Sequence, residues 1–303
     1  MASGPQALLL AGPTASGKSA LAVRLAQAIG GIVVNADSMQ VYADLRILTA
    51  RPSEADARAA PHLLFGLVDA AENFSVARWL DAAKAALAEA RARGATPIFV
   101  GGTGLYFKAL TQGLSAIPAI PEDVRERLRA RAAGLPPQAL HEELERRDPV
   151  MAARLRPSDP QRLLRALEVL EGTGRSLSEF QGAREPPLVG PGNARAVFLD
   201  VESAALKARI DSRFQDMIAA GALEEARRLG ARGLDPALPA MRAHGVPHLL
   251  AHLRGEIGLE EAIALGQRDT RAYARRQRTF ARHQLTDFVR AAPDAAFDLL
   301  RAP

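Results

Sequence analysis

The chain has 303 residues, of which 48% are hydrophobic and 24% are charged, and it contains no cysteine. This composition is typical of a folded globular protein and excludes a largely disordered chain, and the length favours about two domains. The absence of cysteine excludes disulfides and thiol catalysis and favours an intracellular protein. No apolar run approaches the roughly 18–20 residues that span a bilayer, so we expect a cytoplasmic protein without a membrane segment.

The positive charge is concentrated in one segment. The chain carries 39 Lys and Arg side chains against 34 Asp and Glu, a net charge of +5. Residues 268–282 contain six arginines and a single acidic residue, Asp269. A local excess of this kind favours an anionic partner.

The first hundred residues alternate between strand and helix patterns. Short apolar runs predict strands at residues 6–12, 31–36 and 97–101. Helical spacing predicts helices at residues 16–28 and 74–93, the second with Ser75 as its N-cap and Gly94 at its end. This alternation predicts a parallel sheet that binds its ligands at the carboxyl ends of the strands.

The pattern becomes helical after about residue 116. Helical signals continue to about residue 175, residues 185–193 form a Pro/Gly-rich loop, and residues 196–200 predict one more core strand. From residue 204 onward the chain is mostly helical. We therefore predict an α/β fold with a P-loop parallel-sheet core, residues 1–116 and 191–303, a helical C-terminal part, and an α-helical insertion domain at residues 117–190.

A phosphate-binding loop follows the first predicted strand. The sequence GPTASGKS matches G-x-x-x-x-G-K-[ST] and stands between a strand and a helix, as that pattern requires. The backbone amides of such a loop and the helix dipole attract an anion. Lys18 can reach the outer phosphate, and the Ser19 hydroxyl can ligate Mg²⁺. The loop consists of Gly12, Pro13, Thr14, Ala15, Ser16, Gly17, Lys18 and Ser19.

The loop alone does not indicate a kinase. A P-loop hydrolase usually has a metal-binding carboxylate after a later strand, but the strand at 97–101 runs into Gly101-Gly102-Thr103-Gly104. Asp37 instead follows the strand at 31–36, where it would face the loop. It could be a general base, an outer ligand of a metal, or simply the cap of the next turn. Thr103 offers a hydroxyl in a turn that either approaches a ligand or is an ordinary tight turn.

Three groups of arginines stand out. Arg209 and Arg213 lie one helical turn apart and would either cover a pyrophosphate or face solvent. Residues 161–165 begin a helix with two arginines on one face. A third group, the arginine stripe, is spaced by alternating intervals of three and four residues, so it either grips a nucleic-acid backbone or pairs with acids elsewhere in the fold. The stripe consists of Arg268, Arg271, Arg275, Arg278 and Arg282.

Three histidines repeat at every fourth residue. His244, His248 and His252 have the spacing of metal ligands on a helix, with Glu256 four residues further on. Pro247 interrupts the backbone hydrogen bonding of such a helix. We therefore expect ordinary surface or capping histidines here.

Six blocks of the sequence, in this order, resemble the bacterial tRNA dimethylallyltransferases, also called tRNA isopentenyltransferases. They are GPTASGKS, NADSMQVY, GGTGLYFKAL, PSDPQRLLRALEVLEGTG, MIAAGALEEARRL and TRAYARRQRTF, and together they span nearly the whole chain. That family transfers the dimethylallyl group of dimethylallyl diphosphate to the exocyclic amine of the adenosine 3′ of the tRNA anticodon. The products are N6-isopentenyladenosine and diphosphate. The resemblance implies such a prenyltransferase, acting with Mg²⁺, and we expect it to be a monomer.

The resemblance also implies roles for individual residues. The phosphate loop would hold the diphosphate as a leaving group, with Arg213 stabilising its charge. Asp37 would be the general base and Thr103 would lie near the target adenosine. Residues implied to contact the tRNA anticodon stem-loop are Asp37, Ser38, Met39, Gln40, Thr103, Arg125, Gln161, Arg162, Leu163, Leu164 and Arg165, to which the arginine stripe adds Arg275 and Arg278.

The sequence departs from the family pattern at a few positions. Phe280 stands where tryptophan is usual, and residues 242–248 replace a segment that contacts tRNA in relatives. The details of the tRNA contact are therefore expected to differ here, whereas the catalytic residues are intact.

Three other functions remain open from the sequence. An isopentenyltransferase that acts on free adenine nucleotide would need neither the helical insertion nor the arginine stripe. A small-molecule kinase of the P-loop class would consume ATP without tRNA. An RNA-binding ATPase is disfavoured because the third strand lacks the metal-binding carboxylate.

Overall fold

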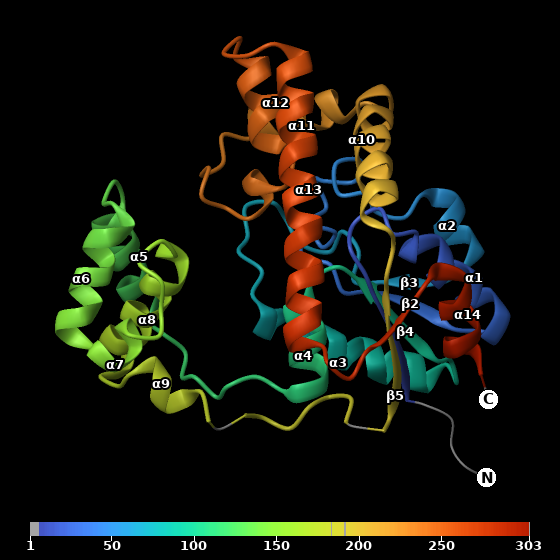
Figure 1. The fold of residues 1–303 in the computed structure, drawn as a ribbon, viewed down its shortest axis with the longest axis horizontal. Helices are drawn as coiled ribbons and strands as arrows, with labels where there is room; N and C mark the ends of the chain where they lie inside the picture. Colours follow the sequence, from blue (N-terminus) through green and yellow to red (C-terminus); the bar gives the residue numbers. More distant parts are fainter. Residues whose placement is uncertain (1–5, 183, 191, 303) are drawn as a thin grey trace. The chain divides into compact units, whose positions relative to one another are not determined.

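The core of the protein is a six-stranded parallel sheet, seen in a computed structural model that describes residues 6–182, 184–190 and 192–302 (Figure 1). The strand order is β3-β2-β4-β1-β5-β6. The strands are β1 (Ala7–Ala11), β2 (Ile32–Asn35), β3 (His62–Leu63), β4 (Pro97–Gly101), β5 (Ala194–Leu199) and β6 (Val289–Ala291). Every residue of β1, β2 and β4 is buried, which explains their continuous apolar sequences.

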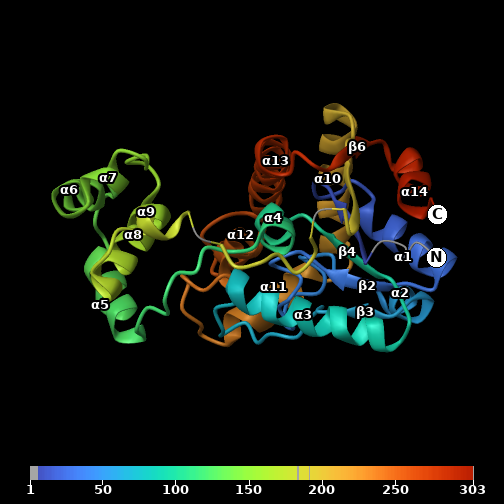
Figure 2. The same cartoon turned by 90° about the horizontal axis from the view of Figure 1, so that it is seen from below.

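Helices cover both faces of the sheet (Figure 2). One face packs against α3 (Val76–Ala92), α4 (Gly104–Gln112) and the end of α13 (Leu259–Gln284). The other face packs against α1 (Lys18–Ile29) and α14 (Pro293–Arg301), and the short α2 (Glu54–Ala59) precedes β3. A parallel sheet buried on both sides in this way requires helical cover on each face.

A helical layer accompanies α13 beyond the sheet. The helix α10 (Ser203–Ala219) packs on α13 through Leu206, Ile210 and Ala274. The helices α11 (Ala222–Ala231) and α12 (Val246–Leu253) and the 3-10 turn η1 (Ala240–Arg242) share a second apolar cluster with residues 41–48. In Figure 1 the long helix α13 runs beside α10 and α12, so it contacts both this layer and the sheet.

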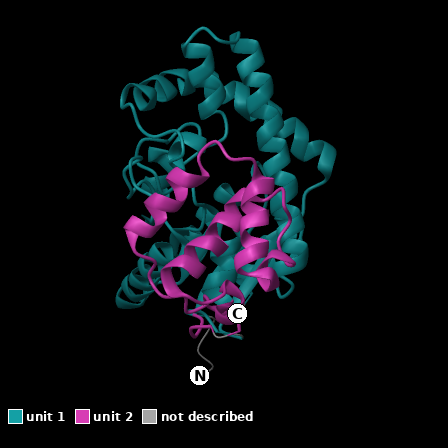
Figure 3. Cartoon of the chain, turned by 90° about the vertical axis from the view of Figure 1, so that its left-hand side faces the viewer, with its two compact units in different colours: residues 1–111, 188–303 teal, residues 112–187 magenta. Residues whose placement is uncertain are grey.

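The chain divides into two compact units (Figure 3). Residues 1–111 and 188–303 form the unit that contains the sheet, and residues 112–187 form a helical unit. The helical unit has its own apolar core, which includes Leu128, Leu144 and Leu167. Its helices are α5 (Glu122–Ala132), α6 (Pro137–Arg147), α7 (Pro149–Ala152), α8 (Pro160–Thr173) and α9 (Leu177–Phe180).

Local sequence explains where several helices begin and end. The Ser75 side chain accepts a hydrogen bond from the Arg78 amide and begins α3, as the sequence predicts. The Asp159 side chain caps α8 in the same way, and Gly174, at φ 70°, ends it. Pro160 occupies the first turn of α8, where a missing amide proton is harmless.

The structure confirms the predicted α/β class with its parallel sheet and its helical C-terminal part. It also contains elements that the sequence did not predict: the two outer strands β3 and β6, and α4, which begins inside the glycine-rich turn. Strands of two or three residues are too short for a periodic signal. Within the described ranges, no helix is both long enough and apolar enough to span a bilayer.

Candidate active site

The phosphate loop connects β1 to α1 and adopts a strained, left-handed backbone at two positions. Gly17 has φ 88° and Ala15 has φ 61°, which is unusual for a residue with a side chain. The Ser16 hydroxyl is buried and has no hydrogen-bond partner. Strain and an unsatisfied hydroxyl in one loop are typical of a site shaped for a ligand.

Three neighbouring strands bring the predicted residues to one edge of the sheet. The phosphate loop follows β1, Asp37 follows β2 and Thr103 follows β4, and these strands lie side by side as β2-β4-β1. The order of the strands reverses at this place: β2, β3 and β4 lie on one side of β1, and β5 and β6 lie on the other. Ligands of parallel α/β sheets bind at such a point.

Asn35 fixes the backbone around Asp37. Its side chain accepts a hydrogen bond from the Asp37 amide at 2.8 Å and donates to the Asp37 carbonyl at 2.9 Å. Asn35 is fully buried, and its own carbonyl accepts a hydrogen bond from the Trp79 indole at 2.9 Å. The position of Asp37 is therefore set by the strand end rather than by its own side chain.

The Asp37 carboxylate is only partly used by the protein. Its Oδ1 accepts a hydrogen bond from the Met39 amide at 2.9 Å, which closes the turn after β2. Across the described residues, the other carboxylate oxygen has no hydrogen-bond partner. Asp37 thus caps a turn, as one interpretation of the sequence held, and still presents an acceptor to the cavity.

Thr103 joins the ends of β2 and β4. Its hydroxyl oxygen accepts a hydrogen bond from the Ser38 amide at 2.9 Å, and its own amide donates to the Ala36 carbonyl at 3.2 Å. The Thr103 hydroxyl also lies 3.2 Å from the Ser38 hydroxyl. The turn that carries Thr103 is therefore held against the turn that carries Asp37.

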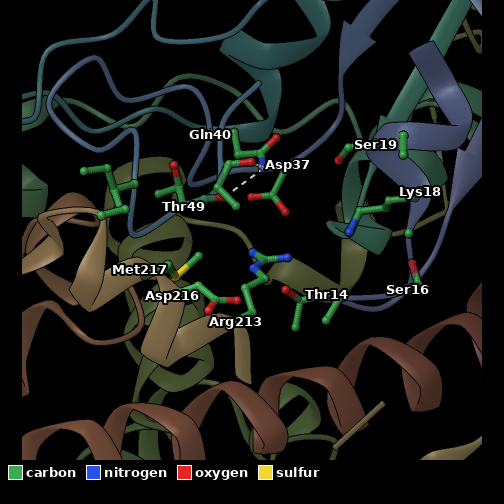
Figure 4. A pocket seen from close by; sticks show the side chains of 16 residues that line it. Thr14, Ser16, Lys18, Ser19, Asp37, Gln40, Thr49, Arg213, Asp216 and Met217 are labelled. Carbon is green, nitrogen blue, oxygen red and sulfur yellow. Dashed lines mark hydrogen bonds between the residues drawn. The ribbon is translucent and has the colours of Figure 1, made fainter. Parts of the chain in front are cut away.

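A cavity of about 390 Å³ opens beside the phosphate loop, and its charged side chains point into one space (Figure 4). Lys18 and Arg213 extend toward the Asp37 carboxylate in this view. The cavity is lined by Thr14, Ala15, Ser16, Gly17, Lys18, Ser19, Ala20, Asp37, Gln40, Ile47, Thr49, Ala50, Arg213, Asp216, Met217 and Ala220.

Burial destabilises the charged forms of both basic side chains in the cavity, so an anion beside them would stabilise those forms. Burial lowers the pKa of Lys18 to about 8, an effect that Asp37 opposes and Arg213 reinforces. Burial also lowers the pKa of Arg213, against the attraction of Asp37. Two cations thus face one carboxylate at close quarters, and a polyanion in the cavity would relieve their repulsion.

A smaller cavity of about 60 Å³ adjoins the first and shares Asp37 and Arg213 with it. Its wall includes the apolar side chains of Leu48, Ile210 and Phe214. It also includes His244 and Tyr273, whose rings lie 4.7 Å apart between centroids. The smaller cavity therefore places apolar and aromatic side chains beside the two charged groups that it shares with the first.

The surroundings of His244 favour its neutral form. Burial lowers its pKa, and the nearby Arg276 adds to this effect, while Asp269 and Asp37 oppose it. Of the other two histidines, His248 lies 2.8 Å from Asp269 and His252 lies 3.1 Å from the Ile257 carbonyl. In the residues that the structure describes, no group of three or more His, Asp or Glu could hold a metal ion.

The segment 46–51, which lines both cavities, is held from the far side by a buried carboxylate. Glu225 accepts hydrogen bonds from the amides of Arg46, Ile47 and Leu48 at 2.8, 2.8 and 2.9 Å. Gln40 donates to the carbonyls of Thr49 and Ala50. This support could not be predicted from the sequence, because Glu225 lies about 180 residues from the segment that it holds.

The arginine stripe is divided between paired and unpaired side chains. Arg271 pairs with Asp211, and Arg278 lies 2.5 Å from the Ser203 hydroxyl and 3.4 Å from Asp200. Arg268 lies 3.3 Å from Asp269. Arg275 and Arg282 are exposed, and no carboxylate among the described residues lies within 4.0 Å of them. Pairing with acids elsewhere in the fold therefore applies to Arg271 and Arg278, whereas Arg275 and Arg282 are left exposed to solvent.

The other predicted RNA-contacting residues belong to the helical unit. Gln161 and Arg162 are exposed at the start of α8, whereas the Leu163 side chain is fully buried in the core of that unit. Leu164 and Arg165 are partly exposed, and Arg165 lies 3.5 Å from Glu168. Arg125 is partly exposed on α5. The burial of Leu163 leaves its exposed neighbours as the side chains that can face a partner.

Comparison with protein-family models gives two matches. Residues 40–284 match the model described as IPP transferase, and residues 5–63 match the model described as isopentenyl transferase. The first match covers Gln40, Thr103, Arg213 and all of α13.

Curated proteins and solved structures agree with these matches. The chain is 68% identical to a tRNA dimethylallyltransferase of Methylocella silvestris and 61% identical to one of Beijerinckia indica, over 96% of each chain in both cases. It is similar to the crystal structure of a full-length tRNA isopentenylpyrophosphate transferase of Bacillus halodurans, with a TM-score of 0.67, 35% identity and coverage of 95% of this chain and 90% of that one. A eukaryotic dimethylallyltransferase acting on tRNA gives a TM-score of 0.79 at 27% identity, covering 97% of this chain and 76% of that one.

Proposed function

The chain belongs to the tRNA dimethylallyltransferase family, and we propose on this basis that it transfers the dimethylallyl group of dimethylallyl diphosphate to the exocyclic amine of the adenosine 3′ of the anticodon in tRNA. The products are N6-isopentenyladenosine and diphosphate. The observation that carries this proposal is the cavity in which Lys18 and Arg213 face Asp37, next to a smaller cavity with Leu48, Ile210 and Phe214 in its wall. A diphosphate with a short apolar tail matches both parts of that site.

The phosphate loop holds the diphosphate as a leaving group. As the allylic carbon–oxygen bond breaks, negative charge grows on the departing diphosphate. The loop amides, Lys18 and Arg213 stabilise that charge because they already surround the cavity before the reaction begins. Partial burial of both cations strengthens the effect.

Mg²⁺ fits the donor atoms at the start of α1. Ser19 is exposed in the first turn of the helix and offers a hydroxyl oxygen, the kind of ligand that Mg²⁺ prefers. This ion usually takes only one or two protein ligands when it also binds phosphates, so a larger cluster of acids is not required. When bound, Mg²⁺ would supply further neutralisation of the diphosphate charge.

Asp37 accepts the proton of the attacking amine. One of its oxygens already accepts a hydrogen bond from Met39, and the other is available to the acceptor base. Thr103, held against Ser38, lies at the same edge of the sheet and contacts the adenosine. A base in an anticodon loop leaves its stack at low cost, so it can reach this site.

We propose that the rest of the tRNA is bound by exposed and partly exposed side chains. In the helical unit these are Arg125, Gln161, Arg162, Leu164 and Arg165, and near the cavity they are Ser38, Met39 and Gln40. Arg275 binds a phosphate from the exposed side of α13. We expect a monomer in the cytoplasm, where its tRNA substrate is found.

The test is incubation with labelled dimethylallyl diphosphate and unmodified tRNA, followed by analysis of the nucleosides. Label in N6-isopentenyladenosine supports the proposal. Parallel reactions contain adenosine monophosphate in place of tRNA, or ATP with small hydroxyl compounds. Prenylation of the free nucleotide alone, or ATP turnover without tRNA, would replace the proposal with one of its alternatives.

A further inference from the structure

Gln277 is a buried amide on the inward face of α13. It is 6% exposed, and the buried residues one turn to either side of it are the small side chains Ala274 and Ala281. The side chains of its two sequence neighbours lie elsewhere: Arg276 lies over the ring of Tyr273, and Arg278 lies near Asp200. A polar side chain among small apolar ones must find partners at its own position, because an unsatisfied buried amide destabilises the fold.

Both ends of the amide are satisfied by loops of the active site. Its Oε1 accepts a hydrogen bond from the Thr14 amide of the phosphate loop at 2.9 Å. Its Nε2 donates to the Gly102 carbonyl, in the turn that carries Thr103, at 3.0 Å. Gln277 therefore joins the turn after β1 to the turn after β4. It needs both a donor and an acceptor to do so, and among side chains of this length only an amide carries both.

The turn after β4 is shaped around α13. A β-carbon on Gly102 would come within 2.0 Å of the Gln277 Nε2, and one on Gly104 would come within 2.2 Å of Phe280. Gly102 has no unusual backbone angle, so space rather than conformation requires the glycine there. The turn thus has glycine at position 102 because Gln277 approaches its backbone so closely.

We propose that Gln277 is a positioning residue, which fixes the phosphate loop relative to the turn of Thr103 and so aligns the diphosphate donor with the acceptor base. This inference rests on the proposed function of the two loops. The two reactants are held by different strands, and Gln277 supplies a direct link between the loops that hold them. Misplacement by about 1 Å can reduce a rate by about 10²-fold, so the link has a measurable kinetic role.

The first test compares Gln277→Met, which keeps the size but loses both hydrogen bonds, with a matched control on the same helix. The control is Gln267→Met, because Gln267 also donates a hydrogen bond from a partly buried position, to the Asp211 carbonyl at 3.0 Å, and in the described residues neither loop is among its hydrogen-bond partners. With saturating tRNA, well below the melting temperature, we expect kcat/KM to fall about 10²-fold in Gln277→Met. The control should keep at least half of the wild-type value. Equal losses in both variants would overturn the proposal.

The second test is a double-mutant cycle between Gln277 and Gly102. Gly102→Ala should displace the amide and reproduce the loss of kcat seen on removing Gln277. In the Gln277→Ala background the nearest remaining atom to the new β-carbon is the Gly12 carbonyl oxygen, at 3.4 Å, an ordinary contact. The second substitution should then cost less than about threefold. Additive losses would show that the two residues do not act through each other.

A binding measurement separates this proposal from the function on which it rests. Mg²⁺–pyrophosphate is titrated into each variant by calorimetry, which needs no transfer of a prenyl group. Gln277→Met should bind it about tenfold more weakly, the effect of losing one net hydrogen bond in the loop, whereas the control should not change. If the wild type forms no N6-isopentenyladenosine, the function fails, and this titration still decides whether Gln277 positions the loop.

Discussion

Lys18 is a residue of the site whose charge depends on its surroundings. Its pKa is lowered to about 8, chiefly by burial, so in the free enzyme the side chain loses its proton as the pH rises above 8. An anion binds the protonated form. Affinity for Mg²⁺–pyrophosphate should therefore be highest below pH 8 and should fall by up to tenfold per pH unit above it.

The control for this pH dependence is Lys18→Arg, because arginine keeps its charge throughout the range. Pyrophosphate affinity, measured by calorimetry between pH 6.5 and about 9.5, should decline more steeply for the wild type than for this variant. Parallel profiles would mean that the Lys18 charge does not control binding.

Asp37 gives a second prediction at the scale of a single residue. Asp37→Asn keeps the hydrogen bond with Met39 and removes the base. Turnover should fall by roughly 10²–10⁴-fold, and the affinity for tRNA should change little. Rates from single-turnover reactions and affinity from filter binding separate these effects. A variant with near-normal turnover would show that another group accepts the proton.

The sequence predicted those residues of the site that follow a strand directly. The phosphate loop is one continuous segment, and Asp37 and Thr103 each come directly after an apolar run that reads as a strand. Gln277 and Glu225 were missed because their partners lie far away in the chain, at Thr14 and residues 46–48. The only signal at Gln277 is a polar side chain on an otherwise small, apolar face of its helix.

At the scale of elements, α13 shows why spacing alone cannot identify a binding surface. The five arginines of the stripe do lie on one helix, but Arg271 and Arg278 are paired with residues of other elements. The spacing of the arginines predicts that they align along one face of the helix. It cannot reveal Asp211 of α10 and Asp200 after β5, the acids that lie near them in the fold. We therefore expect the exposed members of the stripe to bind RNA and the paired members to stabilise the fold.

Arg275 and Arg271 form a matched pair for testing this difference. Arg275→Ala should weaken tRNA binding and flatten the slope of log affinity against log salt by roughly 0.7–0.9, the contribution of one phosphate contact. Arg271→Ala should lower the melting temperature because Asp211 loses its partner, and it should leave the slope unchanged. Binding measured at three salt concentrations decides. An identical slope for wild type and Arg275→Ala would remove that residue from the RNA surface.

The phosphate loop gives a prediction of its own as an element. The strand β4 ends in Gly101, without the carboxylate with which P-loop hydrolases hold their metal. We expect pyrophosphate and dimethylallyl diphosphate to compete for the loop in the presence of Mg²⁺, and Lys18→Ala to weaken both. Steady ATP hydrolysis at about 1–100 s⁻¹, the range of kinases, would contradict this.

At the scale of the whole molecule, the two compact units have separate apolar cores. Leu167 is fully buried in the helical unit, and Leu25 is fully buried beside the sheet. Leu167→Ala should destabilise the helical unit by about 2–5 kcal/mol and weaken tRNA binding, while pyrophosphate binding stays at its wild-type value.

Leu25→Ala provides the opposite control, because it should weaken pyrophosphate binding as the sheet unit loses stability. Calorimetric melting of both variants, with ligand titrations below the transitions, compares the two units. If Leu167→Ala weakened pyrophosphate binding as strongly as Leu25→Ala, the units would not be independent.

The position of β1 in the sheet has a consequence for synthesis on the ribosome. β1 pairs with β4 on one side and with β5 on the other, and the whole helical unit is translated between these two partners. At about 5–20 residues per second, roughly 5–20 s pass between the completion of β4 and that of β5. During this interval the helices of residues 112–187 can fold through local contacts, whereas one edge of β1 has no partner. The nascent chain therefore exposes an apolar strand edge, open to aggregation or chaperone capture, until the last residues of β5 emerge.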